Sequence, residues 1–382
     1  MSFLLVACGG GGSSSAASAA PVSSAPASVQ CKAVAATSTV GTPTLTQFAG
    51  GLVNPWAFVF LPDGRLLVTE RPGRLRIIAT DGTLSAAISG VPAVYAQGQG
   101  GLLDVVLDPD FASNSRIYFS YSESGTGGAG TAVARATLNT LSLSLSSVSV
   151  IYRQTPKVSG DGHFGSRLVF GNDGKLYIAL GERQKFTPAQ DPLQTLGKIV
   201  RINNDGTVPA DNPFVGNSAY LPEIWTLGHR NPQGMTRHPG TGQLWTAEHG
   251  AMGGDEINTP ERGKNYGWPV ISYGLNYDGT KIGEGTSKAG MEQPRCYWDP
   301  SIAPGNVAFY TGGKVAAWNG NLFVAALKDT ALMRLTLNGT QITGQERFSI
   351  GKRVRDVRVG PDGWLYLATD ESAGQILKLT IQ

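Results

Sequence analysis

The sequence predicts an all-β protein, a six-bladed β-propeller of four-stranded antiparallel blades. A strand–turn–strand pattern recurs six times, several of its turns carry an Asp-Gly pair, and helical periodicity is nearly absent. An Asp-Gly pair between two apolar runs is a strong hairpin signal, because both residues tolerate a positive φ. Repeated hairpins joined by loops of unequal length are typical of a propeller.

Each copy begins with an apolar run, turns at a segment that contains Gly, Asp or Asn, and continues into a second apolar run. The six copies span residues 56–78, 103–121, 166–182, 233–248, 306–326 and 355–370. Further strand-like runs, such as residues 333–337 and 375–379, supply outer strands. A pair of β-sandwiches is the alternative fold, but a sandwich needs no sixfold internal repeat.

The two ends of the repeat predict how the ring closes. The last copy ends close to Gln382, and the strand-like run 45–48 precedes the first copy. We therefore expect the N-terminal strand to complete the final blade, which removes an exposed sheet edge. The predicted propeller domain covers residues 39–382.

Composition narrows the class of protein. The 382 residues are 41% hydrophobic and 15% charged, which suits one large domain or two ordinary ones. The 51 Gly and 22 Pro residues lie mostly between short apolar runs, so they mark turns. A net charge of +3 without a long basic run does not indicate nucleic-acid binding. No apolar stretch approaches the roughly 20 residues that span a bilayer.

The N-terminus resembles the end of a bacterial lipoprotein signal. A short apolar run precedes Cys8, and a Gly/Ser-rich tether follows it. The run is short and lacks a basic segment before it, so a plain tail is the alternative. We interpret residues 1–8 as a truncated signal with a lipid anchor at Cys8, and residues 9–38 as a flexible Ser/Ala/Gly linker. Cys31 and Cys296 could pair in an oxidising compartment, but the sequence does not show that they meet.

Polar residues stand at equivalent places in several copies. Lys328 follows the second strand of copy five. Just before the first strand of a copy, or at its start, lie Gln99, His163, Arg230, Asn231, Arg353 and Arg355. In a propeller these positions share one mouth of the central channel, where the cations favour an anionic ligand with many oxygens. His163 is the obvious general base, because imidazole titrates near neutral pH.

The stretch 223–269 offers two kinds of site. Residues 228–231 place a guanidinium and an amide on one turn, which suits a carbonyl-rich ligand. Residues 250–256 place backbone carbonyls beside Asp255 and Glu256, which suits calcium. Taken singly, each charge has a plainer explanation as a surface residue, so the argument for a site depends on their occurrence together.

Seven stretches match one known family in the same order. They are GQGGLLDVVLDPDF, HFGSRLVFGNDGKLYIALGE, LGHRNPQGM, EHGAMGGDEIN, GKNYGWPVISYG, PSIAP and KRVRDVRVGPDG, and they run through nearly the whole chain after the linker. With them the chain resembles the soluble PQQ-dependent sugar dehydrogenases, which include soluble glucose dehydrogenases and aldose sugar dehydrogenases. The shorter aldose branch is more similar, because the chain lacks room for the long insertions of the glucose enzymes.

The resemblance implies roles for single residues. His163 matches the general base, beside the cofactor, and Arg230 with Asn231 matches the pair that holds the quinone oxygens. Further cofactor contacts are implied for Gln99, Tyr277, Lys328, Arg353 and Arg355. Calcium sites are implied at the carbonyls of Gly250 and Ala251, next to the cofactor, and at Glu256 with the carbonyl of Tyr266, as a structural site.

One departure concerns the general base. In the family an Asp often precedes it, whereas here Gly162 precedes His163 and Asp161 lies one residue further back. The residue that orients His163 is therefore left open.

The sequence thus predicts a bacterial, periplasm-facing and lipid-tethered oxidoreductase, a monomer or homodimer. It would oxidise the C1 hydroxyl of aldoses such as glucose to lactones with PQQ and calcium, and a quinone or cytochrome would accept the electrons. A calcium-dependent propeller lactonase or esterase is one alternative, but the cationic mouth would have no purpose there. A non-catalytic carbohydrate-binding propeller is the other, and the intact set of His163, Arg230 and Lys328 argues against it.

Overall fold

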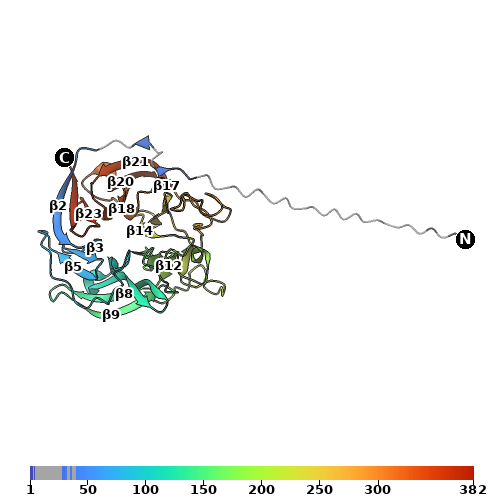
Figure 1. Ribbon diagram of the computed structural model, residues 1–382, viewed down its shortest axis with the longest axis horizontal. Helices are drawn as coiled ribbons and strands as arrows, with labels where there is room; N and C mark the ends of the chain where they lie inside the picture. Colours follow the sequence, from blue (N-terminus) through green and yellow to red (C-terminus); the bar gives the residue numbers. More distant parts are fainter. Residues whose placement is uncertain (3, 5–27, 32–34, 37–39) are drawn as a thin grey trace.

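The computed structural model describes residues 1–2, 4, 28–31, 35–36 and 40–382. In this part of the chain six β-sheets stand around a common centre, and the chain passes through them in order (Figure 1). The inner strand of each sheet packs beside the inner strands of both neighbouring sheets, so the six close a ring. The predicted six-bladed all-β propeller is confirmed.

The blades are antiparallel, and the inner strand comes first along the chain. Blades 1 to 3 contain β3 (Pro55–Phe60), β4 (Leu66–Glu70) and β5 (Arg74–Ile78); β6 (Leu102–Leu107), β7 (Arg116–Gly125), β8 (Gly128–Asn139) and β9 (Ser144–Arg153); and β10 (Gly165–Phe170), β11 (Leu176–Leu180), β12 (Lys198–Ile202) and β13 (Ile224–Leu227). Blades 4 to 6 contain β14 (Pro232–Arg237), β15 (Leu244–Glu248), β16 (Asp255–Asn258) and β17 (Cys296–Trp298); β18 (Pro304–Phe309), β19 (Leu322–Ala326), β20 (Ala331–Asn338) and β21 (Gln341–Ser349); and β22 (Val354–Val359), β23 (Leu365–Thr369) and β24 (Gly374–Ile381), with β2 (Pro43–Leu52) at the edge.

Helix is scarce in the described residues, limited to α1 (Phe111–Asn114) and the 3₁₀ turns η2 (Thr187–Gln190) and η3 (Ala316–Trp318). None of these is long and apolar enough to cross a membrane. Two blades also depart from four strands. Blade 1 has three, with a single bridge from Ile78 to Leu84 beyond β5, and blade 5 gains a fifth, the parallel strand β1 (Ala35–Ala36).

Asp-Gly turns join the inner and second strands of three blades. Gly64, Gly174 and Gly363 have φ values of 87°, 70° and 79°, which an L side chain rarely adopts. In the turn of blade 1 the Asp63 carboxylate accepts a hydrogen bond from the Arg65 N–H at 3.1 Å, which fixes the bend. The hairpins predicted from these Asp-Gly pairs are confirmed.

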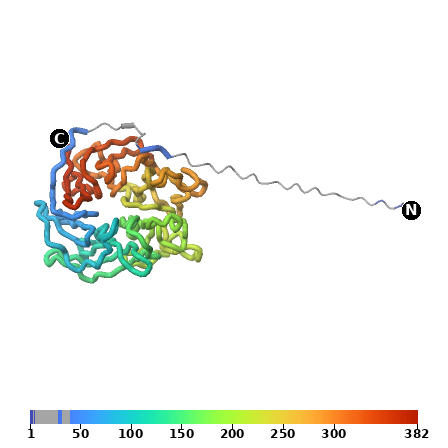
Figure 2. The backbone as a smooth tube through the Cα atoms, viewed as in Figure 1, coloured from blue at the N-terminus to red at the C-terminus, as the bar shows by residue number. Residues whose placement is uncertain are grey.

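The N-terminal strand closes the ring. Strand β2 pairs antiparallel with β24, from Pro43 opposite Ile381 to Leu52 opposite Gly374. Figure 2 shows this blue segment alongside the red C-terminal blade. The predicted completion of the last blade by the N-terminal strand is confirmed.

The described residues of the predicted linker 9–38 are attached to the outside of the propeller. Gln30 forms a parallel bridge with Tyr297 on β17, and β1 pairs with β21. Between them Cys31 forms a disulfide with Cys296 across 265 residues of sequence, so the pairing that the sequence left open is present. Cys8 lies outside the described residues.

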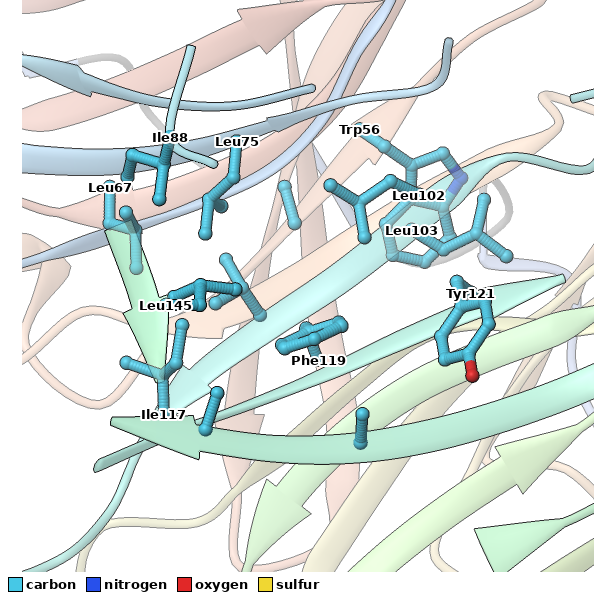
Figure 3. Close-up of a cluster of buried hydrophobic side chains, with 14 of the residues drawn as sticks. Trp56, Leu67, Leu75, Ile88, Leu102, Leu103, Ile117, Phe119, Tyr121 and Leu145 are labelled. Carbon is cyan, nitrogen blue, oxygen red and sulfur yellow. The ribbon is translucent and has the colours of Figure 1, made fainter. Parts of the chain in front are cut away.

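Apolar side chains pack between adjacent blades. Figure 3 shows Trp56 and Leu75 of blade 1 close to Leu102 and Phe119 of blade 2. Each of these four side chains is at most 2% exposed. Burial of this kind at every blade boundary supplies most of the driving force for closing the ring.

Charged side chains fill the centre of the ring between β6, β10 and β14. Asp104 accepts hydrogen bonds from the Arg167 guanidinium at 2.9 Å and from the Leu168 N–H at 2.7 Å. Arg167, which is 0% exposed, also donates from Nε to the Gln233 carbonyl at 3.0 Å. One guanidinium therefore ties together the inner strands of three consecutive blades.

Asp356 on β22 completes this central network. Its carboxylate lies 3.9 Å from the Arg167 guanidinium and accepts hydrogen bonds from the Asn306 amide at 2.6 Å and the Phe58 N–H at 3.0 Å. Asn306 on β18 in turn accepts from the Met235 N–H on β14 at 3.3 Å. All six inner strands therefore contribute to one buried polar network.

We expect Arg167→Met to lower the free energy of unfolding by about 3–5 kcal/mol, because two buried carboxylates then lose the fully buried one of the two guanidinium groups that they share, the other being Arg358. Urea denaturation at pH 7 measures the change. Arg347→Met, which breaks an exposed ion pair with Asp329 in blade 5, is the control and should cost less than about 1 kcal/mol. Equal losses in the two variants would contradict this role of Arg167.

Candidate active site

Most of the predicted cofactor-contact residues lie at one mouth of the channel. Neighbouring strands of a blade are antiparallel, so the start of an inner strand and the end of the second strand share one edge. Gln99 and His163 precede β6 and β10, and Asn231 precedes β14. Arg355 is the second residue of β22. Lys328 follows β19 at the same edge.

His163 lies at this mouth, just before β10, and is 6% exposed. Its backbone N–H donates to Gln99 Oε1 at 2.8 Å, and its Nδ1 lies 2.5 Å from Glu182 Oε1. Its loop has a φ of 51° at His163, an uncommon conformation held here by these contacts. The contact at Nδ1 leaves Nε2 as the nitrogen that can take a proton.

The charges of this pair suit a general base. Burial lowers the pKa of His163 below its ordinary value, although the hydrogen bond to Glu182 opposes that effect. Burial opposes ionisation of Glu182, but the hydrogen bond and charge of His163 hold the pKa of this carboxyl below its ordinary value. At neutral pH the imidazole is therefore neutral and the carboxylate ionised.

Glu182 is the orienting partner that the sequence left open. Asp161 does not reach the ring; its backbone carbonyl accepts a hydrogen bond from the Gln99 N–H at 2.8 Å. Glu182 is 0% exposed and its second oxygen accepts from the Phe186 N–H at 2.7 Å and from the Lys185 N–H. The signal was present, because Glu182 ends copy three and second strands end at this mouth.

Arg183 holds the loop that carries His163, a role that the sequence analysis missed. Its buried guanidinium donates to the carbonyls of Gly162 at 2.8 Å and Gly160 at 2.5 Å. It also lies 3.7 Å above the Phe164 ring. No sequence signal marks such a fan of carbonyl contacts.

Arg230 is fixed next to the loop that begins at Gly250. Its N–H donates to Glu248, and its Nη1 donates to the carbonyls of His249 at 3.1 Å and Gly250 at 2.5 Å. Its Nε is buried and has no hydrogen-bond partner among the described residues. Trp268 lies 5.2 Å from its guanidinium carbon. Arg230 is therefore held in place, and its Nε–H is among the donors that it retains for a ligand.

Asn231 and His249 brace the same region. Asn231 accepts a hydrogen bond from the Gly165 N–H at 3.1 Å, which links blades 3 and 4. His249 lies 2.6 Å from the Pro304 carbonyl through Nε2, and burial with the charges of Arg355 and Arg230 lowers its pKa to about 3. His249 is therefore neutral and structural.

Cations outnumber carboxylates on the opposite side of the mouth. Asp370 lies 2.5 Å from Arg355 and 3.8 Å from Arg353. Against the effect of burial, the charge and hydrogen bond of Arg355, with smaller effects of Asn54 and Arg71, lower the pKa of Asp370 to about 2. Arg71 lies near the same group, and burial together with the charges of Arg355 and Arg353 lowers its pKa. Lys328 is exposed and forms no ion pair with the described residues. Among the described residues, Asp370 thus lies near three arginines, Arg71, Arg353 and Arg355.

Carboxylates predominate beneath the Gly250 loop. A cavity of about 20 Å³ is lined by Arg230, Glu248, Gly250, Glu256 and Tyr266, among others. Burial, and then the charge of Glu248, raises the pKa of Glu256 to about 8. The described residues contain no group of three or more His, Cys, Asp and Glu side chains arranged for a metal ion, so a cation here would need backbone carbonyls.

Two of the predicted site residues differ in their surroundings. Tyr277 is 76% exposed and makes no hydrogen bond or ring contact with the described residues, so the structure does not bring it to the others. Ala251 is 7% exposed and lies beside Gly250 in the loop before β16.

Comparisons with known proteins place the chain in a family. The glucose/sorbosone dehydrogenase family model matches residues 52–378. Aldose sugar dehydrogenase YliI of Escherichia coli is 48% identical over 86% of this chain and 90% of its own length. The crystal structure of the aldose sugar dehydrogenase from Escherichia coli in the apo-form has a TM-score of 0.87 at 47% identity, covering 89% of this chain and 100% of that one. The PQQ-bound aldose sugar dehydrogenase of Streptomyces coelicolor has a TM-score of 0.74 at 26% identity, covering 90% and 100%.

We expect Glu182→Gln to lower the pKa of the His163 imidazole further, because the carboxylate that favours its protonated form is lost. The chain has four His, so NMR titration of their ring protons can follow each one, with His163→Gln as the assignment. Glu248→Gln is the matched control, since Glu248 contacts His229 at 2.9 Å and not His163. An unchanged His163 titration in Glu182→Gln would contradict the pairing.

Proposed function

The chain belongs to the glucose/sorbosone dehydrogenase family, and we propose on this basis that it is a PQQ- and calcium-dependent aldose sugar dehydrogenase. It would oxidise the C1 hydroxyl of an aldose, which yields the lactone. The observation that carries this proposal is the neutral His163 imidazole, backed by an ionised Glu182, at a mouth with excess positive charge.

The chain's own residues divide the chemistry between them. His163 Nε2 would take the proton of the anomeric hydroxyl, while Glu182 holds Nδ1 and stabilises the imidazolium that forms. Bound PQQ would supply the redox chemistry by accepting the hydride, and thus two electrons, from the same carbon. Arg230 would stabilise negative charge that develops nearby, and its fixed position means that little reorganisation is needed.

The donor set fits an anionic quinone. Arg230 Nε and Arg355 Nε are buried without hydrogen-bond partners among the described residues, and Lys328 and Arg353 project exposed charge at the same mouth. Carboxylate and carbonyl oxygens are the groups that such donors bind. We propose Gln99, Asn231, Lys328, Arg353 and Arg355 as cofactor contacts, with Arg71 as an added charge; Tyr277 remains a proposal on resemblance.

For calcium the two predicted sites differ in support. Glu256 shares a small buried cavity with Glu248 and Tyr266, and the charge of Glu248, which adds to burial in raising the pKa of Glu256, supports a cation there. We propose this cavity as a calcium site. The Gly250 carbonyl already accepts a hydrogen bond from Arg230, so calcium at Gly250 and Ala251 rests on the resemblance alone.

The disulfide bears on the compartment. Disulfides form and persist mainly where the environment is oxidising, so the pairing of Cys31 with Cys296 supports a periplasmic location. A lipid anchor at Cys8, a quinone or cytochrome as electron acceptor, and a monomer or homodimer remain proposals from the sequence.

A calcium-dependent lactonase is the less favoured function. It would place a metal on carboxylates at the channel centre, but Asp104 and Asp356 are there engaged by Arg167 and by backbone N–H groups. A carbohydrate-binding propeller without catalysis would not need the pairing of His163 with Glu182.

Reconstitution tests the proposed activity. The full chain, stripped of metals, is given PQQ with and without calcium, and reduction of a dye is followed with a panel of aldoses. We expect activity only with both additions, and in His163→Ala retained PQQ binding with turnover lower by about 10²–10⁴-fold. His238→Ala, which alters a turn after β14, is the control and should keep full turnover. Failure of the full chain to bind PQQ would rule out the function.

Calcium binding is tested without turnover. Calcium should raise the midpoint of thermal unfolding of the metal-free protein, because it binds the native state and relieves the repulsion between Glu248 and Glu256. Glu256→Gln should lose this response. Glu261 is an exposed carboxylate shortly after β16, and Glu261→Gln should keep the calcium response. The same calcium response in all three proteins would place the cation elsewhere.

A further inference from the structure

Lys198 is a fully buried lysine that the proposed chemistry does not use. It begins β12 and is 0% exposed. Its Nζ donates to the backbone carbonyls of Pro188 at 2.8 Å, Ala189 at 2.9 Å and Leu196 at 2.8 Å. All three donors of the ammonium are therefore taken up by carbonyl oxygens from one segment of the chain.

No carboxylate contacts this ammonium in the part of the chain that the structure describes. Asp191 acts on it electrostatically, but the Asp191 oxygens accept from the Leu193 N–H at 2.9 Å and the Gln194 amide at 2.7 Å. Burial lowers the pKa of Lys198 to about 7, against the effect of Asp191. An ammonium that binds only backbone carbonyls holds the loop in one conformation, as a metal ion bound to the same kind of oxygens would.

The gathered carbonyls belong to segment 183–197, which joins β11 to β12. The Ala189 carbonyl also accepts from the Gly228 N–H at 3.0 Å, at the turn that leads to Arg230. In the other direction, the Ala189 N–H donates to the Phe186 carbonyl at 3.1 Å, and the Phe186 N–H donates to Glu182 at 2.7 Å. A continuous series of contacts thus leads from Lys198 to both halves of the site.

The same segment carries an aromatic side chain, Phe186, that contacts Trp268 next to Arg230. Phe186 is 39% exposed and its ring lies 5.3 Å from that of Trp268, the side chain over which Arg230 is placed. Gly197, at the other end of the segment, accepts from the His229 N–H at 3.1 Å. Movement of this segment would therefore displace Glu182, Phe186 and the turn before Arg230 together.

We propose that Lys198 is a positioning residue of the active site: its ammonium fixes segment 183–197, so that Glu182 stays on His163 and Phe186 stays against Trp268. The effect on turnover rests on the proposed function. The effect on the segment itself does not, and the two parts are measured separately.

The first measurement is amide hydrogen exchange on the ligand-free full chain. In Lys198→Met we expect exchange at Lys185 and Phe186 to rise about tenfold or more, while amides of β10 change only with global stability. Arg201→Met is the matched control, because Arg201 is a buried cation on the same strand that contacts Asp173 and Asp211 instead of the segment. It should lose stability without a selective rise at Lys185 and Phe186.

The second measurement is steady-state kinetics with PQQ and calcium. In Lys198→Met we expect kcat to fall about tenfold or more relative to Arg201→Met, because the base and the turn before Arg230 are both misplaced. Lys198→Gln, whose amide keeps two donors, should show a smaller change in the same direction. It also serves for both measurements if Lys198→Met does not fold.

Each outcome decides one part. If exchange at Lys185 and Phe186 in the Lys198 variants rises no more than at the amides of β10, the proposal is overturned, whether or not the protein binds PQQ. Selective exchange with kcat no lower than in Arg201→Met would leave Lys198 a structural residue only, which also overturns it. A wild-type chain without PQQ activity would remove the proposed function, while the exchange result for the segment would still stand.

Discussion

The contact of one buried guanidinium, Arg167, with the carboxylates of Asp104 and Asp356 is the constraint on which the rest of the structure depends. Apolar packing between blades is non-directional and does not by itself fix how the six inner strands meet. Buried charges must be paired and hydrogen-bonded, so they admit few alternative arrangements. Because this network fills the centre of the ring, the space for a ligand is at the mouth of the channel, where the inner strands begin.

A contact made by a carboxylate recurs at that mouth. In four blades a carboxylate at the end of the second strand receives a group from the segment before or at the start of an inner strand: Glu70 receives the Val53 N–H, Glu182 receives His163, Glu248 receives the Arg230 N–H and Asp370 receives Arg355. In blade 5 the equivalent place holds Lys328, exposed and with its charge reversed. The proposed site thus uses a contact that recurs among the blades, with His163 as the partner of the carboxylate in blade 3 and a lysine at this edge in blade 5.

Much of this could be predicted from the sequence, and the limits are physical. Hairpins with Asp-Gly turns, the closing strand β2 and the shared mouth follow from local periodicity and from antiparallel geometry, so they were predicted correctly. The contact between His163 and Glu182 joins residues that are 19 apart in sequence, so the residues next to His163 do not indicate it. The place of Glu182 at the end of a second strand is nevertheless a usable signal. Lys198 could not be found, since its partners are backbone carbonyls, which carry no sequence signal. The attachment of Cys31 to blade 4 was left open for a related reason: a Ser/Ala/Gly-rich segment gives no indication of which edge it joins.

The distribution of charge explains why the two proposed cofactors belong together. Arg355, Arg353 and Arg71 lie near a single carboxylate, Asp370, so this side favours an anionic ligand. Across the mouth, Glu256 and Glu248 share one buried cavity, where burial and then the charge of Glu248 raise the pKa of Glu256, which supports the cation that we propose there. Arg230 donates from Nη1 to the Gly250 carbonyl, and its Nε has no hydrogen-bond partner among the described residues. An anionic ligand suits the arginines and a cation suits the carboxylates, so the two sides of the mouth favour different partners. This difference is why we propose PQQ and calcium together.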